Sequence, residues 1–258
     1  MFSALLLAPL LTLSATEIRR VPTTDAGQGV ASDGKYVYAI DNHIIARIDP
    51  KTARVKARWE GDPAKFKHIN SCTVDDRTLI CAESNYPTVP MESMIERFDA
   101  RSLTYLSTQH LADTPGSLTW TMRHDGAWWA CFANYDARGG QPGRDHRFTT
   151  LVRYDDQWHE QTRWTFPDTV LERMAPRSAS GGVWGRDGLL YVTGHDRPEL
   201  YALRVPEGGG VLEHVATIAI PTDGQAIAWD GRDPRLLWSI ERKTRELVAT
   251  RIPEVLAR

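Results

Sequence analysis

The sequence predicts an all-β chain folded as a β-propeller of five four-stranded blades. Residues 27–34 read G-Q-G-V-A-S-D-G and residues 224–231 read G-Q-A-I-A-W-D-G, so the two ends of the chain carry the same local pattern. Each copy leads into a turn and a short β-rich run, and units of this kind recur along the chain. Self-similar units of a few tens of residues are the sequence signature of repeat architectures such as propellers.

Each of the five units contains the further strands of a blade. The second strand follows an Asp-containing turn, the usual punctuation of a β-hairpin. These second strands are residues 36–40, 78–82, 128–132, 190–194 and 236–240. The third strand has one arginine inside an apolar run, and these arginines are Arg47, Arg97, Arg153, Arg204 and Arg251. A fourth strand is expected in four units, at residues 54–59, 103–109, 158–164 and 211–220.

The fifth unit stops after its third strand, at residues 251–253. We expect residues 16–21 to supply the missing strand, which closes the ring and removes an exposed sheet edge. Six blades are the alternative if the long third unit hides another, and a two-sheet sandwich is the alternative architecture. The only helix expected covers residues 168–174, with Asp168 as its N-cap.

The first thirteen residues are apolar, a run too short to span a bilayer. It is typical of the hydrophobic region of a signal peptide, and small residues follow it. We therefore expect residues 1–15 to be a signal peptide, residues 16–258 to be a single propeller domain, and the protein to be periplasmic or secreted. The alternative is that this run is an apolar N-terminal strand.

The charges are nearly balanced, with 31 basic and 33 acidic residues. This balance argues against a nucleic-acid partner bound through phosphate neutralisation and against a polybasic membrane-surface protein. There is also no serine-hydrolase elbow, zinc-protease helix motif, phosphate-binding loop, closely paired cysteine motif or dinucleotide-binding turn. Ser-His-Asp hydrolysis and nicotinamide chemistry are therefore disfavoured.

Polar residues gather where the second strands end and the first strands begin, and in a propeller these positions share one face. The long insertions at residues 84–93, 135–149 and 166–178 fall on that face too. Long loops collected over one end of a scaffold usually mark a site or its lid. The ligand-binding residues expected there are Gln28, Asp41, Asn42, His68, Asn70, Asn85, Asn134, Tyr135, Gln225 and Glu241.

Two kinds of chemistry fit the acids on this face. Asp41, Glu83 and Asn134 are the expected ligands of a divalent cation such as calcium, which prefers oxygen donors. Glu83, His195 and Asp196 are the expected catalytic residues, because a carboxyl with a raised pKa or an oriented imidazole acts as a general acid or base. The simpler interpretation of His195-Asp196 is an ordinary turn.

The blade pattern resembles the lactonase-like and cycloisomerase-like β-propellers of bacteria, especially short exported members whose function is mostly unassigned. The resemblance rests on residues 27–34 and 224–231 and on the run T-G-H-D-R-P-E at residues 193–199. It covers nearly all of residues 16–258. In calcium-dependent lactonase propellers the metal ligands are Glu, Asn and Asp around the axis, and Asp41, Glu83, Asn134 and Asp196 are similar in kind.

Two functions are therefore expected. The first is a hydrolase or isomerase acting on a lactone, a sugar acid or a similar small polar molecule. The second is a non-catalytic propeller that binds a carbohydrate, a peptide or a partner protein.

The second blade predicts a disulfide between Cys72 and Cys81. If Asp76 and Arg77 form a two-residue hairpin loop, residue 75 pairs with 78, and residue 72 then pairs with 81. This is a non-hydrogen-bonded pair, whose Cα atoms lie about 4.5 Å apart, a separation that a disulfide spans. Cys131 occupies the position of Cys81 in the next blade, and we expect it to be a buried free thiol. Three reduced core cysteines are the alternative.

Overall fold

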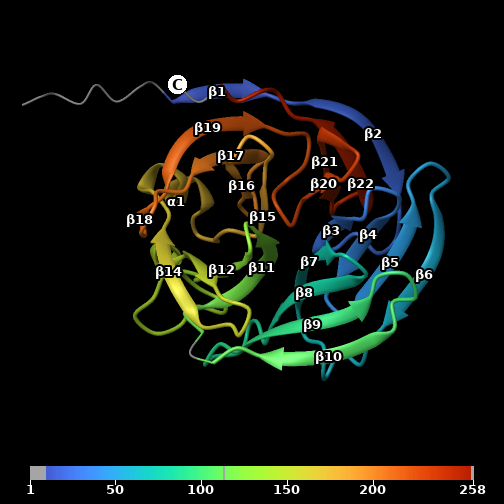
Figure 1. Ribbon diagram of the computed structural model, residues 1–258, viewed down its shortest axis with the longest axis horizontal. Helices are drawn as coiled ribbons and strands as arrows, with labels where there is room; N and C mark the ends of the chain where they lie inside the picture. The colour runs from blue at the N-terminus through green and yellow to red at the C-terminus, as the bar shows by residue number, and fades with distance from the viewer. Residues whose placement is uncertain (1–9, 113, 257–258) are drawn as a thin grey trace, which may run out of the picture.

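The computed structural model describes residues 10–112 and 114–256 and forms a ring of five antiparallel sheets around a central axis (Figure 1). Blade 1 contains β3 (Gly29–Ser32), β4 (Val37–Asp41), β5 (Ile44–Asp49) and β6 (Arg54–Glu60), from the axis outward. Blade 2 contains β7 (Ile69–Asp75), β8 (Thr78–Ser84), β9 (Ser93–Asp99) and β10 (Tyr105–His110).

The other three blades follow the same plan. Blade 3 contains β11 (Ser117–His124), β12 (Ala127–Ala133), β13 (Thr150–Tyr154) and β14 (Glu160–Thr165). Blade 4 contains β15 (Gly181–Trp184), β16 (Leu190–Thr193), β17 (Glu199–Arg204) and β19 (Glu213–Ala219). Blade 5 contains β20 (Ala228–Asp230), β21 (Asp233–Glu241), β22 (Glu246–Arg251) and β2 (Thr16–Pro22). The five-bladed propeller is therefore confirmed, and the long third unit forms one blade.

Closure by the N-terminal strand is also confirmed. Strand β2 lies antiparallel to β22, with Thr16 opposite Arg251 and Pro22 opposite Glu246. The side chain of Val21 is buried among the apolar residues between blades 5 and 1. The two ends of the domain thus share one sheet, which satisfies the backbone of an otherwise exposed edge.

A short strand precedes the closing strand. Strand β1 (Leu11–Ser14) pairs in parallel with β19 and becomes a fifth strand of blade 4, with Leu13 opposite Ile218. These residues belong to the expected signal peptide, whose residues 1–9 lie outside the described part of the chain. Cleavage after Ala15 would remove β1 and leave β2 in place. No helix among the described residues is long and apolar enough to cross a membrane.

Three local expectations need correction. The helix α1 (Asp168–Met174) has the expected range, but its N-cap is Pro167 and no side-chain cap hydrogen bond forms. The strand expected at residues 211–220 begins only at Glu213, because β18 (Gly210–Val211) pairs instead with β14 of blade 3. The fourth strand of blade 2 begins at Tyr105, because Leu103 has a positive φ and ends the preceding turn.

Apolar side chains fill the space between neighbouring blades. Between blades 1 and 2, Tyr38 and Ile40 of β4 lie in one buried cluster with Leu79, Cys81 and Phe98 of blade 2. Alternation along each strand sends every second side chain into such a space. Burial of an aliphatic or aromatic side chain stabilises the fold by about 1.5–3 kcal/mol.

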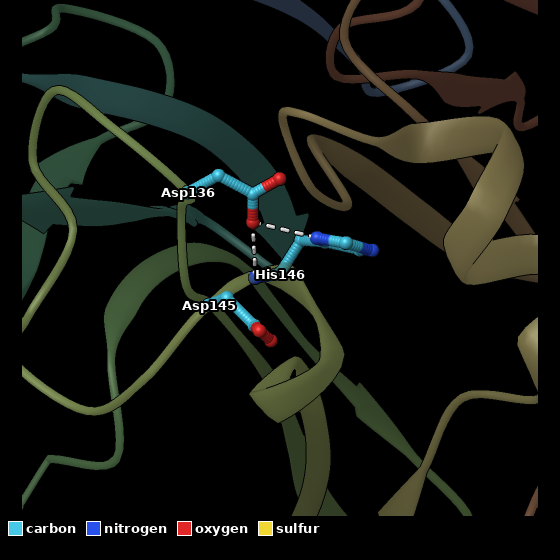
Figure 2. Close-up of side chains that lie close together, drawn as sticks. All are labelled: Asp136, Asp145 and His146. Carbon is cyan, nitrogen blue, oxygen red and sulfur yellow. Dashed lines mark hydrogen bonds and ion pairs between the residues drawn. The ribbon is translucent and has the colours of Figure 1, made fainter.

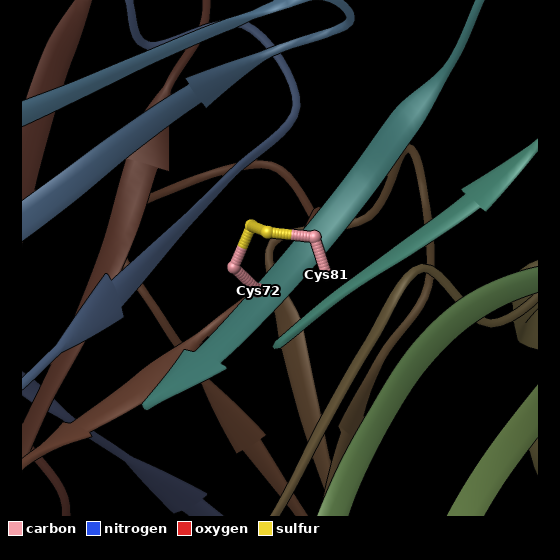
Figure 3. The surroundings of a disulfide bond; sticks show 2 residues. All are labelled: Cys72 and Cys81. Atoms are coloured by element: carbon pink, nitrogen blue, oxygen red, sulfur yellow. A yellow bond between two sulfur atoms is a disulfide. The ribbon is translucent and has the colours of Figure 1, made fainter. Parts of the chain in front are cut away.

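The hairpin register in blade 2 is the one the sequence predicts. Asp75 lies opposite Thr78, and Cys72 lies opposite Cys81. The two cysteines form a disulfide with a Cα–Cα distance of 4.0 Å (Figure 3), and Cys131 is a buried free thiol. The predicted bond is confirmed.

We expect the protein to contain one free thiol when it is unfolded in denaturant without reductant. The double variant Cys72→Ser/Cys81→Ser should lower the free energy of unfolding by about 2–3 kcal/mol, the low end for disulfides because the loop is short. Cys131→Ser is the control for the thiol count, which should fall to zero. A count of three in the wild-type protein would contradict the bond.

Candidate functional site

The loops that join the second and third strands of the blades surround one mouth of the central channel. An open cavity of about 530 Å³ lies there, between blades 1, 4 and 5. Its lining residues are Gly27, Gln28, Asp41, Asn42, His195, Asp196, Asp223, Arg242, Lys243 and Arg245. We call this the mouth cavity. Five of the residues selected from the sequence, Gln28, Asp41, Asn42, His195 and Asp196, line it together.

A chain of hydrogen bonds crosses blade 1 at the edge of the mouth cavity. The Asn42 amide Nδ2 donates to Asp41 Oδ1 at 3.1 Å, and Asn42 Oδ1 faces His68 Nδ1 at 2.7 Å. Gln28 Nε2 also donates to Asn42 Oδ1. Because a carboxylate only accepts, the Asn42 oxygen must face His68, so Nδ1 carries the proton and Nε2 has the lone pair.

The Asp41 carboxylate lies close against the backbone of Gly27. A Cβ atom at Gly27 would lie 2.2 Å from Asp41 Cγ, so any larger residue there would displace the carboxylate. The carboxylate also pairs with Arg245 Nη1 at 2.8 Å, so its charge is already balanced.

The rings of His68, Tyr86 and Tyr135 form a row that we call the aromatic wall. The ring centroid of Tyr86 lies 5.0 Å from that of His68 and 5.1 Å from that of Tyr135. The Tyr86 hydroxyl accepts from Arg177 Nη1 at 3.2 Å. Burial, together with the nearby charges of His195 and Arg242, lowers the pKa of His68 to about 4. His68 is therefore a neutral imidazole at neutral pH.

His195 and Asp196 form a second oriented imidazole. His195 Nδ1 lies 2.5 Å from Asp196 Oδ1, and His195 Nε2 lies 3.2 Å from Arg242 Nη1. The carboxylate accepts the Nδ1 proton, so Nε2 holds the lone pair and accepts from the guanidinium. Burial lowers the pKa of His195 more than the Asp196 carboxylate raises it. This imidazole is also neutral at neutral pH.

Glu83 lies beneath the mouth rather than in it. Its carboxylate is fully buried and accepts from the Lys67 backbone N–H at 2.7 Å, which fixes the turn that carries His68. Oε2 has no partner if the group is ionised. Burial, followed by the neighbouring buried Glu96 carboxylate, raises the pKa of Glu83 to about 8. The proton on Glu83 supplies the missing hydrogen bond, to Glu96.

Three of the selected amides brace loops. Asn70 Nδ2 donates to the Leu118 carbonyl at 2.8 Å and joins blades 2 and 3. Asn85 holds both ends of residues 85–92 through Pro90 O and Glu92 N. Asn134 Nδ2 donates to Pro115 O and Phe148 O.

The other selected residues lie around the mouth. Gln225 Nε2 donates to the His195 carbonyl at 3.4 Å, and Glu241 Oε1 accepts from the Lys243 N–H at 3.0 Å. Tyr135 belongs to the aromatic wall.

Two of the three expected metal ligands are engaged elsewhere, Asp41 by Arg245 and Glu83 by Lys67 and Glu96. Asn134 Nδ2 donates to two carbonyls, and Asn134 Oδ1 is buried without a hydrogen-bond partner in the described part of the chain. Within the described ranges, the one cluster of three potential metal ligands is Asp136, Asp145 and His146 (Figure 2). There, His146 Nδ1 lies 2.6 Å from Asp136 Oδ1 and Asp145 pairs with Arg147. These contacts brace an exposed loop.

Sequence reasoning missed the cations of the mouth. Arg242, Lys243 and Arg245 lie in the turn between β21 and β22, and Arg177 comes from the connection between blades 3 and 4. These cations could have been selected from their positions in loops on the selected face. The contacts of Arg242 with His195, 47 residues away, and of Arg245 with Asp41, 204 residues away, could not be predicted from the sequence.

These features define a five-bladed propeller with a polar, arginine-rich mouth. Among solved structures, the chain is similar to the PQQ-bound form of aldose sugar dehydrogenase from Streptomyces coelicolor, with 13% identity, a TM-score of 0.55 and coverage of 95% of this chain and 83% of that one. It is also similar to a chain of the mitotic checkpoint complex, with 9% identity, a TM-score of 0.51 and coverage of 98% and 99%. At these identities the likeness shows the fold alone. No family model and no curated protein matches the chain.

Proposed function

We propose that the mouth cavity binds a small polar molecule with a carboxylate, such as a sugar acid or a lactone that keeps a second, free carboxylate, and that His195 acts on it as a general base. The observation that carries the proposal is the set of contacts on His195. Asp196 fixes its tautomer, and its basic Nε2 points to Arg242 on the cavity wall. A lowered pKa keeps the base unprotonated at neutral pH.

Arg242 has a second part in this proposal. In the structure, the Arg242 guanidinium donates to the lone pair of His195 Nε2. A carboxylate is a stronger acceptor than an imidazole and matches the planar guanidinium in two places. Substrate binding would therefore draw Arg242 away and expose Nε2. With a lactone, Nε2 would take a proton from water as the water oxygen bonds to the carbonyl carbon, and would return it to the ring oxygen as the ring C–O bond breaks.

The same contact supports the alternative of a non-catalytic binding propeller. If Arg242 stays on Nε2, the imidazole has no free lone pair, and the mouth only holds its ligand. A carbohydrate or a peptide carboxylate would satisfy Arg242 and the aromatic wall equally well.

We also propose that residues 1–15 form a signal peptide, that residues 16–258 form the mature domain, and that the protein is periplasmic or secreted. A disulfide is typical of those compartments.

The test is a panel of lactones and sugar acids assayed with the purified protein. We expect His195→Gln to lower kcat/KM by about 10²–10⁴-fold, the usual contribution of a general base. Asp196→Asn should lower it less and shift the pH profile. His159→Gln, an exposed histidine paired with Asp155, should leave activity unchanged. Binding of a panel member without turnover, lost in Arg242→Gln, would favour the non-catalytic propeller.

A further inference from the structure

Of the five repeated arginines, only Arg47 is buried. Arg97 Nη2 donates to Gln109 Oε1 at 2.8 Å, Arg204 pairs with Glu213, and Arg251 pairs with Asp233. Arg47, on β5, is only 9% exposed and has no acidic partner among the described residues. A guanidinium is always charged, and burying it without an anion is costly.

The contacts of Arg47 leave part of its guanidinium unsatisfied. One Nη donates to the Arg101 carbonyl, and the guanidinium carbon lies 4.2 Å from the centroid of the Tyr36 ring. The Nε atom is buried and has no hydrogen-bond partner. A planar guanidinium held over an aromatic ring, with an unused donor, is suited to bind an oxyanion.

Arg47 lines a cavity of about 740 Å³ between blades 1 and 2. We call it the blade 1–2 cavity. It is built from hairpins on the face opposite the mouth cavity, and its lining residues are Asp33, Lys35, Tyr36, Tyr38, Arg47, Val74, Asp76, Arg77, Asp99, Ala100 and Arg101. Lys35, Arg77 and Arg101 are exposed at its rim, and within the described residues none of the three forms an ion pair.

Two of the three acids in this cavity accept hydrogen bonds from the backbone of the turns in which they lie. Asp33 Oδ1 accepts from the N–H groups of Lys35 and Tyr36, and Asp33 Oδ2 accepts from the Tyr38 hydroxyl. Asp99 Oδ1 accepts from the N–H groups of Arg101 and Ser102. These carboxylates hold the hairpins in shape. Four cations and three carboxylates therefore line the cavity, which leaves an excess of positive charge.

We propose that the blade 1–2 cavity is a second binding site, for a small organic molecule bearing an oxyanion, either a phosphate or a carboxylate, that rests on Arg47. Lys35 and Arg77 at the rim hold the outer part of the anionic group. The volume lies in the range of small-molecule sites and exceeds the size of a single phosphate. The site is independent of the mouth and of the activity proposed there.

The test is calorimetric titration of the full chain at low salt with pyrophosphate in one arm and citrate in the other. We expect at least one of the two to bind, and the tighter arm identifies the preferred oxyanion. Arg77→Gln, an exposed change that should not disturb folding, should weaken binding several-fold. Arg47→Met should weaken it by about tenfold or more, the effect of losing a charged hydrogen-bond donor.

Arg54→Gln and Arg242→Gln are the controls. Arg54 is exposed on β6 of the same blade, so Arg54→Gln should bind like the wild type. Arg242 lies in the mouth cavity, so Arg242→Gln removes any citrate binding at the mouth and should keep the binding of pyrophosphate or citrate at the blade 1–2 cavity. If Arg47→Met does not fold, Arg77→Gln and Lys35→Gln test the site on their own. Absence of binding in both arms, unchanged binding in the cavity variants, or loss of all binding in Arg242→Gln would each overturn the proposal.

Discussion

A chain that begins at Thr23 should lose most of its stability, whereas a chain that begins at Thr16 should melt like the full-length protein. The shorter chain lacks β2, which pairs along β22 from Thr16 opposite Arg251 to Pro22 opposite Glu246. It loses a ladder of hydrogen bonds worth about 0.5–1.5 kcal/mol each and the buried side chain of Val21. We expect the melting temperature to fall by about 10 °C or more.

Thermal unfolding followed by circular dichroism measures this effect. The loss should be cooperative, because the closing strand joins the first and last parts of the ring. The chain that begins at Thr16 also lacks β1, so it separates the contribution of β1 from that of β2. An unchanged melting temperature for the chain that begins at Thr23 would contradict closure by β2.

Glu83→Gln should make the protein more stable at alkaline pH and remove the loss of stability that the Glu83 carboxyl causes between about pH 5 and 8.5. Burial and Glu96 raise the pKa of Glu83 to about 8 from an ordinary value of 4.5. A carboxyl with a raised folded-state pKa stabilises the protein fully below pH 4.5 and loses that contribution as the pH rises through 8. The Glu83 carboxyl should therefore contribute a loss of roughly 4 kcal/mol over this window.

Glutamine keeps the neutral shape of the protonated acid. Its carbonyl can accept from the Lys67 N–H, and its amide can donate to Glu96. The free energy of unfolding in urea at pH 5, 7 and 9 measures the effect, and Glu92→Gln, an exposed acid in the following loop, should follow the wild type. Parallel curves for Glu83→Gln and the wild type would show that the buried pair does not hold the proton.

Much of the candidate site follows from the repeat phase. Once the blades are aligned, the ends of β4 and β16 fall on one face, so Asp41, Asn42 and His195 share the mouth. The direction of a side chain also follows from strand alternation. Glu83 lies two residues after Cys81 on β8, so it shares the disulfide's face towards blade 1. That argument was open to sequence reasoning and predicts that the Glu83 side chain lies between blades 1 and 2.

The propeller, the closing strand and the Cys72–Cys81 bond were predictable from the sequence, because each depends on local features: strand alternation, turn residues and the repeated phase of short motifs. Only the folded structure shows which partners the charged side chains contact. Arg245 lies 204 residues from the Asp41 that it neutralises, and Arg242 lies 47 residues from His195. Such contacts arise only when the ring closes and brings distant loops together. The charge, pKa and free lone pair of a group depend on those neighbours, so the chemistry of the mouth was not readable from the motifs that built it.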